Sequence, residues 1–309
     1  MAIKFDYLDS LKSYLRINSA IEDDVVQELC THIEDKSEEF MDSGLSADEA
    51  IRTAIQSLGS PKLVAKQMYE VYSQGSWKQT LFAALPHLLV ALFFTMHWWH
   101  ITAWLSPMLL IVIGIAIYGW THDKPAWLFP WLGYCLVPVI IIGMLFINLP
   151  GGWAWIAAIA YIPLALCILF PVAKKTIERD WLFASLMLLP IPVVLGWRLA
   201  LGIEDMQQWL ARICDTAQPI ALSFAVLALT VATFIRVRQR WAKTGALLIA
   251  ETIPLVVVAS SDKNAVGLCT WIFLILLFLF IIISPALLDP VLRRSSGKEL
   301  SHTAHKITR

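Results

Sequence analysis

The sequence has few charged residues and lacks the short motifs that mark common enzyme families. Charged side chains make up 16% of its 309 residues and hydrophobic side chains 58%, whereas soluble domains carry roughly 25% charged residues. No Walker loop, HExxH zinc motif, GxSxG nucleophile motif or dinucleotide-binding glycine motif is present. We therefore expect no enzyme activity, no catalytic residues, no cofactor and no metal site.

Cysteine is also scarce, and the cysteines that occur follow no ligand or disulfide pattern. None belongs to a CxxC pair, and three of them lie inside apolar segments, where a single cysteine usually serves as a small packing residue. A disulfide framework or a cysteine-ligated metal is therefore not expected. The cysteines are Cys30, Cys135, Cys167, Cys214 and Cys269.

The first 75 residues contain no long apolar run, and the N-terminal part differs from the rest in charge. Residues 1–78 hold 14 acids and 8 bases, a net charge of −6. Residues 79–309 hold 10 acids and 16 bases, a net charge of +6. The sequence therefore predicts an acidic soluble head over residues 1–76, joined by a hinge at Gly75-Ser76 to an apolar body.

Helix start and stop signals divide the head into three or four short helices. Ser19-Ala-Ile-Glu22 and Ser46-Ala-Asp-Glu49 are capping boxes, in which a hydroxyl and a carboxylate each bond a free backbone amide. Gly44 and Gly59 suit helix C-caps, and Pro61 suits the first position of a helix. These signals predict a small N-terminal helical bundle.

Three stretches of the head carry a resemblance to a known family. They are Glu28-Leu-x-x-His32-Ile-Glu34, Gly44-Leu-Ser-Ala-Asp-Glu-Ala50 and Leu58-Gly-Ser-Pro61, with Ala54 between the last two. Over roughly residues 5–72 the head resembles the permease-prefix, or HAAS-type, helical domain. The resemblance implies a cytoplasmic regulatory or interaction module of bacterial membrane proteins, often associated with PadR-like repressors or transport permeases. It does not imply an enzyme.

The body divides into eight apolar segments, most of them near the roughly 20 residues needed to cross a ~30 Å hydrocarbon core. Basic residues favour one side of the alternating loops, with 13 Lys and Arg on the side of the head and three on the other. The predicted fold class is all-α, with a polytopic transmembrane bundle over 77–290, a basic tail over 291–309 and both termini cytoplasmic. The predicted spans are 80–98, 101–120, 127–147, 153–173, 181–200, 217–235, 244–260 and 266–288.

Tryptophan is abundant, with 14 in the chain, and many lie at the ends of these segments. An indole there lies partly in water and partly in lipid, so interfacial anchoring explains the tryptophans better than an aromatic ligand cage does. Those at segment ends are Trp77, Trp98, Trp99, Trp120, Trp127, Trp153, Trp181 and Trp241.

Glu251 is the strongest candidate for chemistry inside the body. It lies in the shortest segment, three residues before Pro254, and an acid at the bilayer centre costs roughly 2.5–3.5 kcal/mol on insertion scales. One interpretation is a proton or cation site, with Pro254 freeing backbone carbonyls nearby. The other is an acid that pairs with Lys243 or another basic loop residue. We expect His87 to bond a neighbouring helix rather than to ligate haem.

An acidic helix face in the head is the candidate partner-binding surface. It comprises Glu28, His32, Asp35 and Glu39, in the helix that follows Ser19. Its carboxylates would repel nucleic-acid phosphates, so we expect no nucleic-acid partner. Besides the lipid bilayer, the expected partner is a basic surface of a cytoplasmic protein or a second copy of this chain. The alternative is a helix face that is simply solvated.

These features together predict a bacterial inner-membrane regulatory or scaffolding protein whose cytoplasmic head binds a protein partner. The alternative is a transporter or permease component that uses Glu251 and the proline-broken helices. The two halves of the body show no convincing internal repeat, which weakens the transporter hypothesis.

Overall fold

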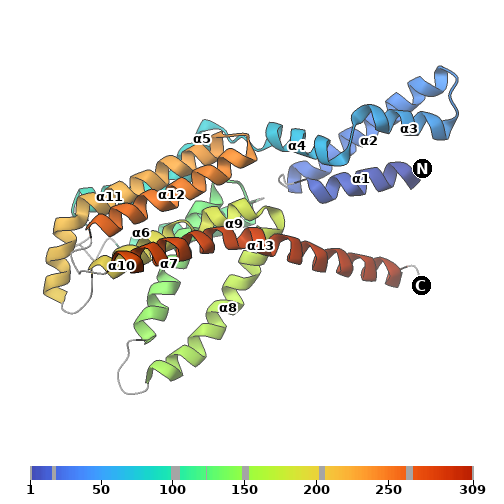
Figure 1. Ribbon diagram of the computed structural model, residues 1–309. Coiled ribbons are helices and arrows are strands. Elements are labelled where there is room, and N and C mark those ends of the chain that lie inside the picture. The colour runs from blue at the N-terminus through green and yellow to red at the C-terminus, as the bar shows by residue number, and fades with distance from the viewer. Residues whose placement is uncertain are drawn as a thin grey trace.

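The structure, a computed structural model, is helical throughout the part of the chain that it describes. It describes residues 2–15, 19–98, 105–122, 124–147, 153–201, 206–261 and 267–307. Every regular element in these ranges is a helix. Trp99 and the predicted starts of two spans, at residues 101 and 266, lie outside them. Figure 1 shows the first four helices at one end of an elongated molecule and most of the later helices at the other, with α13 running back towards the first four.

Four helices in the N-terminal part share one hydrophobic core, and we call these helices the head. Side chains from all four are buried in that core, including Leu11, Ile33, Ala54 and Val64. The core explains why the three shorter helices form, because isolated helices of 12 or 13 residues are marginal in water. The head helices are α1 (Ala2–Tyr14), α2 (Ser19–Asp42), α3 (Ala47–Leu58) and α4 (Pro61–Tyr72).

The second capping box and the two glycines of the head act where the sequence predicts them. Ser46 and Glu49 form the capping box at the start of α3, with the Ser46 hydroxyl 2.6 Å from the Glu49 carboxylate. Gly44 and Gly59 follow α2 and α3 with φ of 98° and 92°, a conformation that only glycine adopts without strain. Ser19 begins α2, and its side chain lies outside the described residues, so the first capping box is not tested.

Nine helices follow the head in the described ranges, and we call them the body. A helix occurs in each of the eight predicted apolar segments, and one segment contains two. The helices are α5 (Trp77–Thr95), α6 (Leu105–Thr121), α7 (Leu128–Ile147), α8 (Trp153–Arg179), α9 (Trp181–Leu188), α10 (Pro190–Leu201), α11 (Met206–Arg236), α12 (Arg240–Ser261) and α13 (Leu268–Ile307).

The described ranges contain six helical segments that are long and apolar enough to cross a membrane. The apolar stretches in α6 and α7 are shorter, at Pro107–Thr121 and Leu128–Ile140. The predicted count of eight spans is therefore not confirmed. The six are Trp77–Thr95, Ile159–Ile177, Trp181–Leu201, Arg212–Arg236, Arg240–Ser261 and Trp271–Asp289.

The segment predicted as a single helix at 181–200 is broken into α9 and α10. The break falls at Leu189, just before Pro190 and close to Pro192. Proline has no amide hydrogen, so two carbonyls of the preceding turn lose their helical donors at this point. By contrast, Pro138 in α7 and Pro163 in α8 lie inside continuous helices.

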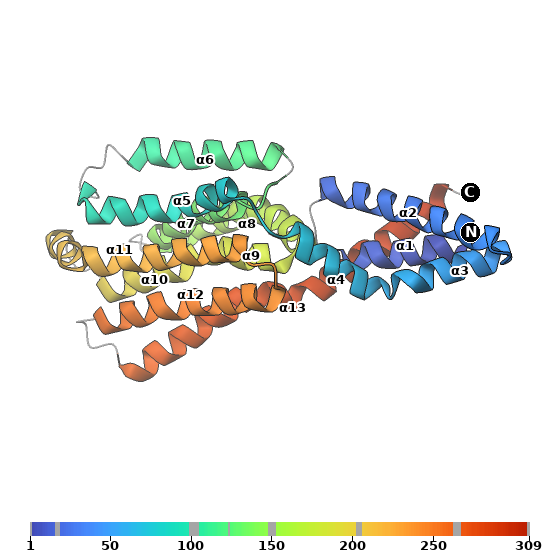
Figure 2. The same ribbon diagram turned by 90° about the horizontal axis from the view of Figure 1, so that it is seen from above.

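Several helices extend beyond the predicted segments. Helix α8 continues to Arg179, and α11 begins at Met206 instead of residue 217. Helix α13 runs through to Ile307, so the residues predicted as a separate basic tail continue the last helix of the body. Figures 1 and 2 both place the two ends of the chain at the same end of the molecule.

The body packs around α11, which lies against α5 and α12. Figure 1 shows α7 and α8 side by side, at an angle to α11 and α12. Large apolar side chains cover the outer surface of the body, including Leu110, Ile159, Leu229 and Phe273, each more than 60% exposed. A surface of this kind is stable against lipid and unfavourable against water. Together with the long apolar helices, it is consistent with a multi-pass membrane protein.

Candidate functional site

The four residues proposed for partner binding lie along one exposed face of α2. Their spacing of four, three and four residues brings Glu28, His32, Asp35 and Glu39 onto one side of a helix with 3.6 residues per turn. All four side chains are exposed, whereas Val25, Leu29 and Ile33 of the same helix are buried in the head core. The structure therefore brings these four residues together, and we call them the α2 acidic face.

Only one member of the α2 acidic face has an ionic partner in the described residues. The Lys36 ammonium lies 2.7 Å from the Glu39 carboxylate, and this hydrogen bond lowers the Glu39 pKa. In the described ranges Glu28, His32 and Asp35 make no hydrogen bond or ion pair. Their polar groups are therefore available to a partner.

Glu251 is buried in α12, and the described residues supply its carboxylate with no hydrogen-bond partner. Its side chain is 0% exposed. Lys243, the partner considered for it, instead donates to the Ser73 carbonyl at 3.3 Å. Pro254 is also buried, and its missing amide hydrogen leaves the Ala250 carbonyl without its usual helical donor. The Glu251 carboxylate thus lies next to a backbone carbonyl that has lost its usual helical donor.

His87 is buried in α5 and contacts α7 through an aromatic ring. Its ring centre lies 5.1 Å from that of Tyr134, with the planes at 78°. Among the described residues, neither ring nitrogen of His87 nor the Tyr134 hydroxyl has a hydrogen-bond partner. The predicted contact with a neighbouring helix is present, but it is an edge-to-face ring contact. Within the described ranges, no hydrogen bond, ion pair or ring contact joins His87 to Glu251.

The connection between head and body is held in place, contrary to the predicted hinge at Gly75-Ser76. The Gly75 amide donates to the Ile235 carbonyl at 2.9 Å, and Arg236 donates to the Gly75 carbonyl at 3.1 Å. The connection therefore runs against the end of α11, about 160 residues away in sequence. Ser76 caps α5, accepting from the Gln79 amide at 3.2 Å, which fixes the entry into the body.

Side chains from the turn between α11 and α12 strengthen this junction. Arg238 donates to the Gln74 side chain at 2.7 Å, and the Ser73 hydroxyl donates to the Arg238 carbonyl at 3.3 Å. The Arg236 guanidinium lies 4.3 Å from the Trp77 ring centre, a cation–π contact at the start of α5. Basic residues that the sequence suggested only as loop charges thus fasten the head to the body.

A second polar group of the junction lies where α8 meets α9. The Arg240 guanidinium donates to Asp180 at 2.5 Å. Asp180 is fully buried and also caps α9 by accepting from the Leu182 amide at 3.2 Å. Next to it, burial lowers the pKa of Arg179 to about 10, and this side chain donates to the Lys124 carbonyl. The only sequence signal for this group is an acid directly before an apolar segment.

Comparison with known proteins finds a family match within the head. Residues 6–67 match the HAAS family model, which confirms the resemblance predicted over roughly residues 5–72. No curated protein and no solved structure matches the chain. The head is thus similar to the HAAS domain over residues 6–67, and the body carries several apolar helices.

Proposed function

We propose that this chain is a bacterial inner-membrane regulatory or scaffolding protein whose head binds a cytoplasmic protein. The observation that best supports this proposal is the α2 acidic face, on which Glu28, His32 and Asp35 are exposed and lie side by side. A junction that fixes the head at the end of the body supports the same role. A head held in this way would present its partner at a constant position above the membrane.

The proposal includes a body of eight spans, with the head (residues 1–76) and the tail (residues 291–309) both in the cytoplasm. The transmembrane part covers residues 77–290. The six long apolar segments and the shorter apolar stretches of α6 and α7 together account for eight crossings. An even number of spans places both termini on the same side of the membrane. This agrees with Figure 2, where both termini lie at one end of the molecule. Basic residues such as Arg236 and Arg238 lie at the junction. Because cytoplasmic loops are enriched in Lys and Arg, they favour a cytoplasmic position for the junction.

The chemistry of the α2 acidic face favours a basic protein surface as the partner. Three carboxylates within three helical turns attract lysine and arginine side chains and repel phosphates. Exposed charges of this kind mainly increase the rate of association and select the partner. Binding should therefore weaken as the salt concentration rises.

The test places a photo-crosslinking amino acid at His32 of the full-length chain in cells. A second position, the exposed Gln56 of α3, serves as the control site. We expect an adduct with a cytoplasmic protein from His32 but not from Gln56. Glu28→Gln/Asp35→Asn should abolish the adduct, whereas Asp6→Asn/Asp9→Asn, which removes two exposed acids from α1, should leave it.

Three outcomes would contradict this proposal. An adduct that survives Glu28→Gln/Asp35→Asn unchanged would show that the α2 acidic face is not the contact. The absence of any adduct from His32 would show that the α2 acidic face is a solvated surface and not a binding site. An adduct with only a second copy of this chain would replace the cytoplasmic partner by self-association.

The buried Glu251 favours a second candidate function, a transporter or permease component. A buried carboxylate with no partner in the described residues, one turn before a buried proline, has the features of a proton or cation site. The test measures proton or sodium flux in vesicles that contain the full-length protein. Glu251→Gln should stop a flux that depends on this site, and Thr252→Ser on the same helix should not. A flux unchanged by Glu251→Gln would eliminate this candidate.

A further inference from the structure

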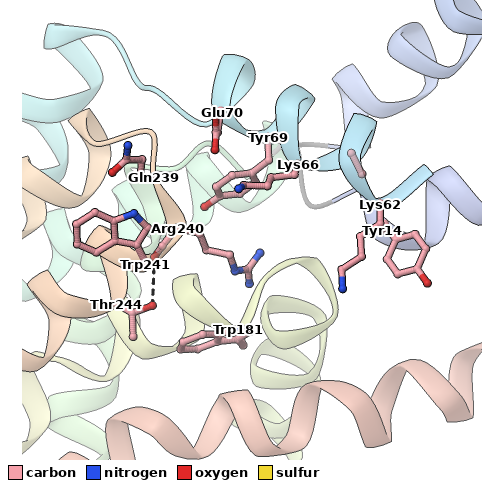
Figure 3. Close-up of a pocket in the computed structure, with 11 residues that line it drawn as sticks. Tyr14, Lys62, Lys66, Tyr69, Glu70, Trp181, Gln239, Arg240, Trp241 and Thr244 are labelled. Carbon is pink, nitrogen blue, oxygen red and sulfur yellow. Dashed lines mark hydrogen bonds between the residues drawn. The ribbon is translucent and has the colours of Figure 1, made fainter. Parts of the chain in front are cut away.

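A cavity of about 790 Å³ lies between the head and the body. Figure 3 shows that side chains from α4 form one wall and that Trp181 of α9 and the start of α12 form the opposite wall. Its volume is within the range of small-molecule sites, about 300–1,000 Å³. The lining residues that the argument uses are Lys62, Lys66, Tyr69, Trp181, Arg240 and Trp241.

The walls of this junction cavity carry more positive than negative charge. Lys62, Lys66 and Arg240 line it, and Glu70 is the acid among its lining residues. Lys62 and Lys66 lie one turn apart on α4, and both are exposed. Neither lysine has an ion pair within the described ranges. The lining therefore carries three cations and one acid, and two of the cations are exposed lysines.

Arg240 is held in a fixed position in the cavity. Its guanidinium is bonded through Nη2 to Asp180 and lies 5.5 Å and 5.8 Å from the ring centres of Tyr69 and Trp181. Figure 3 shows it between these two rings. A guanidinium has five N–H donors, so the Asp180 bond leaves others for a bound anion. Because its position is already set, little side-chain entropy is lost when a ligand binds.

The junction cavity lies at the level where two apolar segments begin. Trp181 starts the segment Trp181–Leu201, and Arg240 starts the segment Arg240–Ser261. Trp241 is 75% exposed beside Arg240. Tryptophans at the ends of membrane helices lie at the depth of the lipid headgroups. The start of α12 also brings the positive end of a helix dipole to the cavity.

We propose that the junction cavity binds the phosphate of an anionic phospholipid headgroup. Lys62 and Lys66 supply the attraction, Arg240 supplies directional hydrogen bonds, and Trp181 and Trp241 pack against the glycerol and the first acyl carbons. A water-soluble phosphate ester has the same charged group, but it has no apolar part for the tryptophans. The bound lipid would join the head to the body at the membrane surface. The site does not depend on the α2 acidic face.

The experiment measures lipid binding to the full-length protein, purified in a neutral detergent, by native mass spectrometry. The probes are dioleoyl phosphatidylglycerol, dioleoyl phosphatidylcholine and the soluble ester glycerol 1-phosphate. Lys62→Gln/Lys66→Gln removes two cations from the cavity. Arg52→Gln/Lys78→Gln removes two exposed cations outside it, one of them in the first turn of α5, and is the matched control.

We expect wild type and the control variant to bind phosphatidylglycerol tightly and the other two probes weakly. Two juxtamembrane lysines typically change such binding by roughly 30-fold in affinity, so Lys62→Gln/Lys66→Gln should weaken it by about that factor. Equal weakening in the control variant would overturn the site, because the effect would then be general surface charge. Glycerol 1-phosphate that binds as tightly as the lipid would overturn the lipid assignment. Binding of phosphatidylcholine that matches phosphatidylglycerol would overturn the role of the lysines.

Discussion

Replacing Gly75 by alanine should release the head from the body without unfolding either part. A Cβ at Gly75 would lie well inside van der Waals contact of the Ile235 Cγ2 methyl and 3.0 Å from the Gln79 side-chain oxygen. Ile235 is 2% exposed and belongs to the core of the body, so its methyl group cannot move aside. The connection must therefore shift away from α11.

The shift should break the two hydrogen bonds that hold Gly75 in place. The bond from its amide to the Ile235 carbonyl contributes about 1 kcal/mol, and the charged bond from Arg236 contributes about 1.5–3 kcal/mol when buried. Because Arg236 is half-exposed, we expect the two hydrogen bonds together to stabilise the connection by about 2–3 kcal/mol. The backbone amides of the connection should then exchange with solvent roughly 30- to 150-fold faster.

The measurement is hydrogen–deuterium exchange of the peptide that spans Ser73 to Thr80, in the full-length protein. Gly245→Ala is the control, because a Cβ at Gly245 of α12 meets nothing within 4 Å. The double variant Gly75→Ala/Ile235→Ala removes the opposing methyl and should restore slow exchange in this peptide. It should do so even though Ile235→Ala leaves a cavity in the body.

Three results would refute this reasoning. Slow exchange in Gly75→Ala would show that the connection tolerates a Cβ and that its contact with α11 is not tight. Fast exchange that Ile235→Ala does not reverse would show that the effect arises from the alanine itself and not from the clash. Equal changes in Gly245→Ala would point to a general loss of stability.

Three further predictions concern the head and the body. Leu11→Ala should lower the stability of the head by about 2–5 kcal/mol, measured by thermal unfolding, because Leu11 is fully buried in its core. Ser185→Ala should weaken the contact of α9 with α13 by about 1 kcal/mol, since its buried hydroxyl lies 2.6 Å from the Ile282 carbonyl; crosslinking of the two helices measures it. Hydrogen bonds from the Ser46 hydroxyl and backbone lower the Glu49 pKa below its ordinary value of 4.5. The capping box should therefore stabilise the head above pH 4.5 and stop doing so as the pH falls through the lowered pKa. Unfolding curves measured at a series of pH values should show this loss of stability. In Ser46→Ala the loss should be smaller.

The local features of this protein follow from its sequence alone. Capping signals such as Ser46 with Glu49, and glycines such as Gly44, mark helix ends because they act on backbone groups within one turn. The α2 acidic face follows from the spacing of its residues, since helical periodicity decides which side chains share a face. Apolar segments of about 20 residues likewise predict membrane helices from composition and length. The resemblance to the HAAS family rests on such local signals and was confirmed over residues 6–67.

The tertiary structure alone decided how head and body meet. The junction joins Gly75 to Ile235 and Arg238 to Gln74, and the cavity brings Lys62 and Lys66 opposite Arg240. It also showed that Lys243 bonds the connection instead of Glu251. Periodicity and end signals act within a few residues of chain. Contacts between segments about 160 residues apart depend on how whole helices pack, and no local pattern specifies that packing.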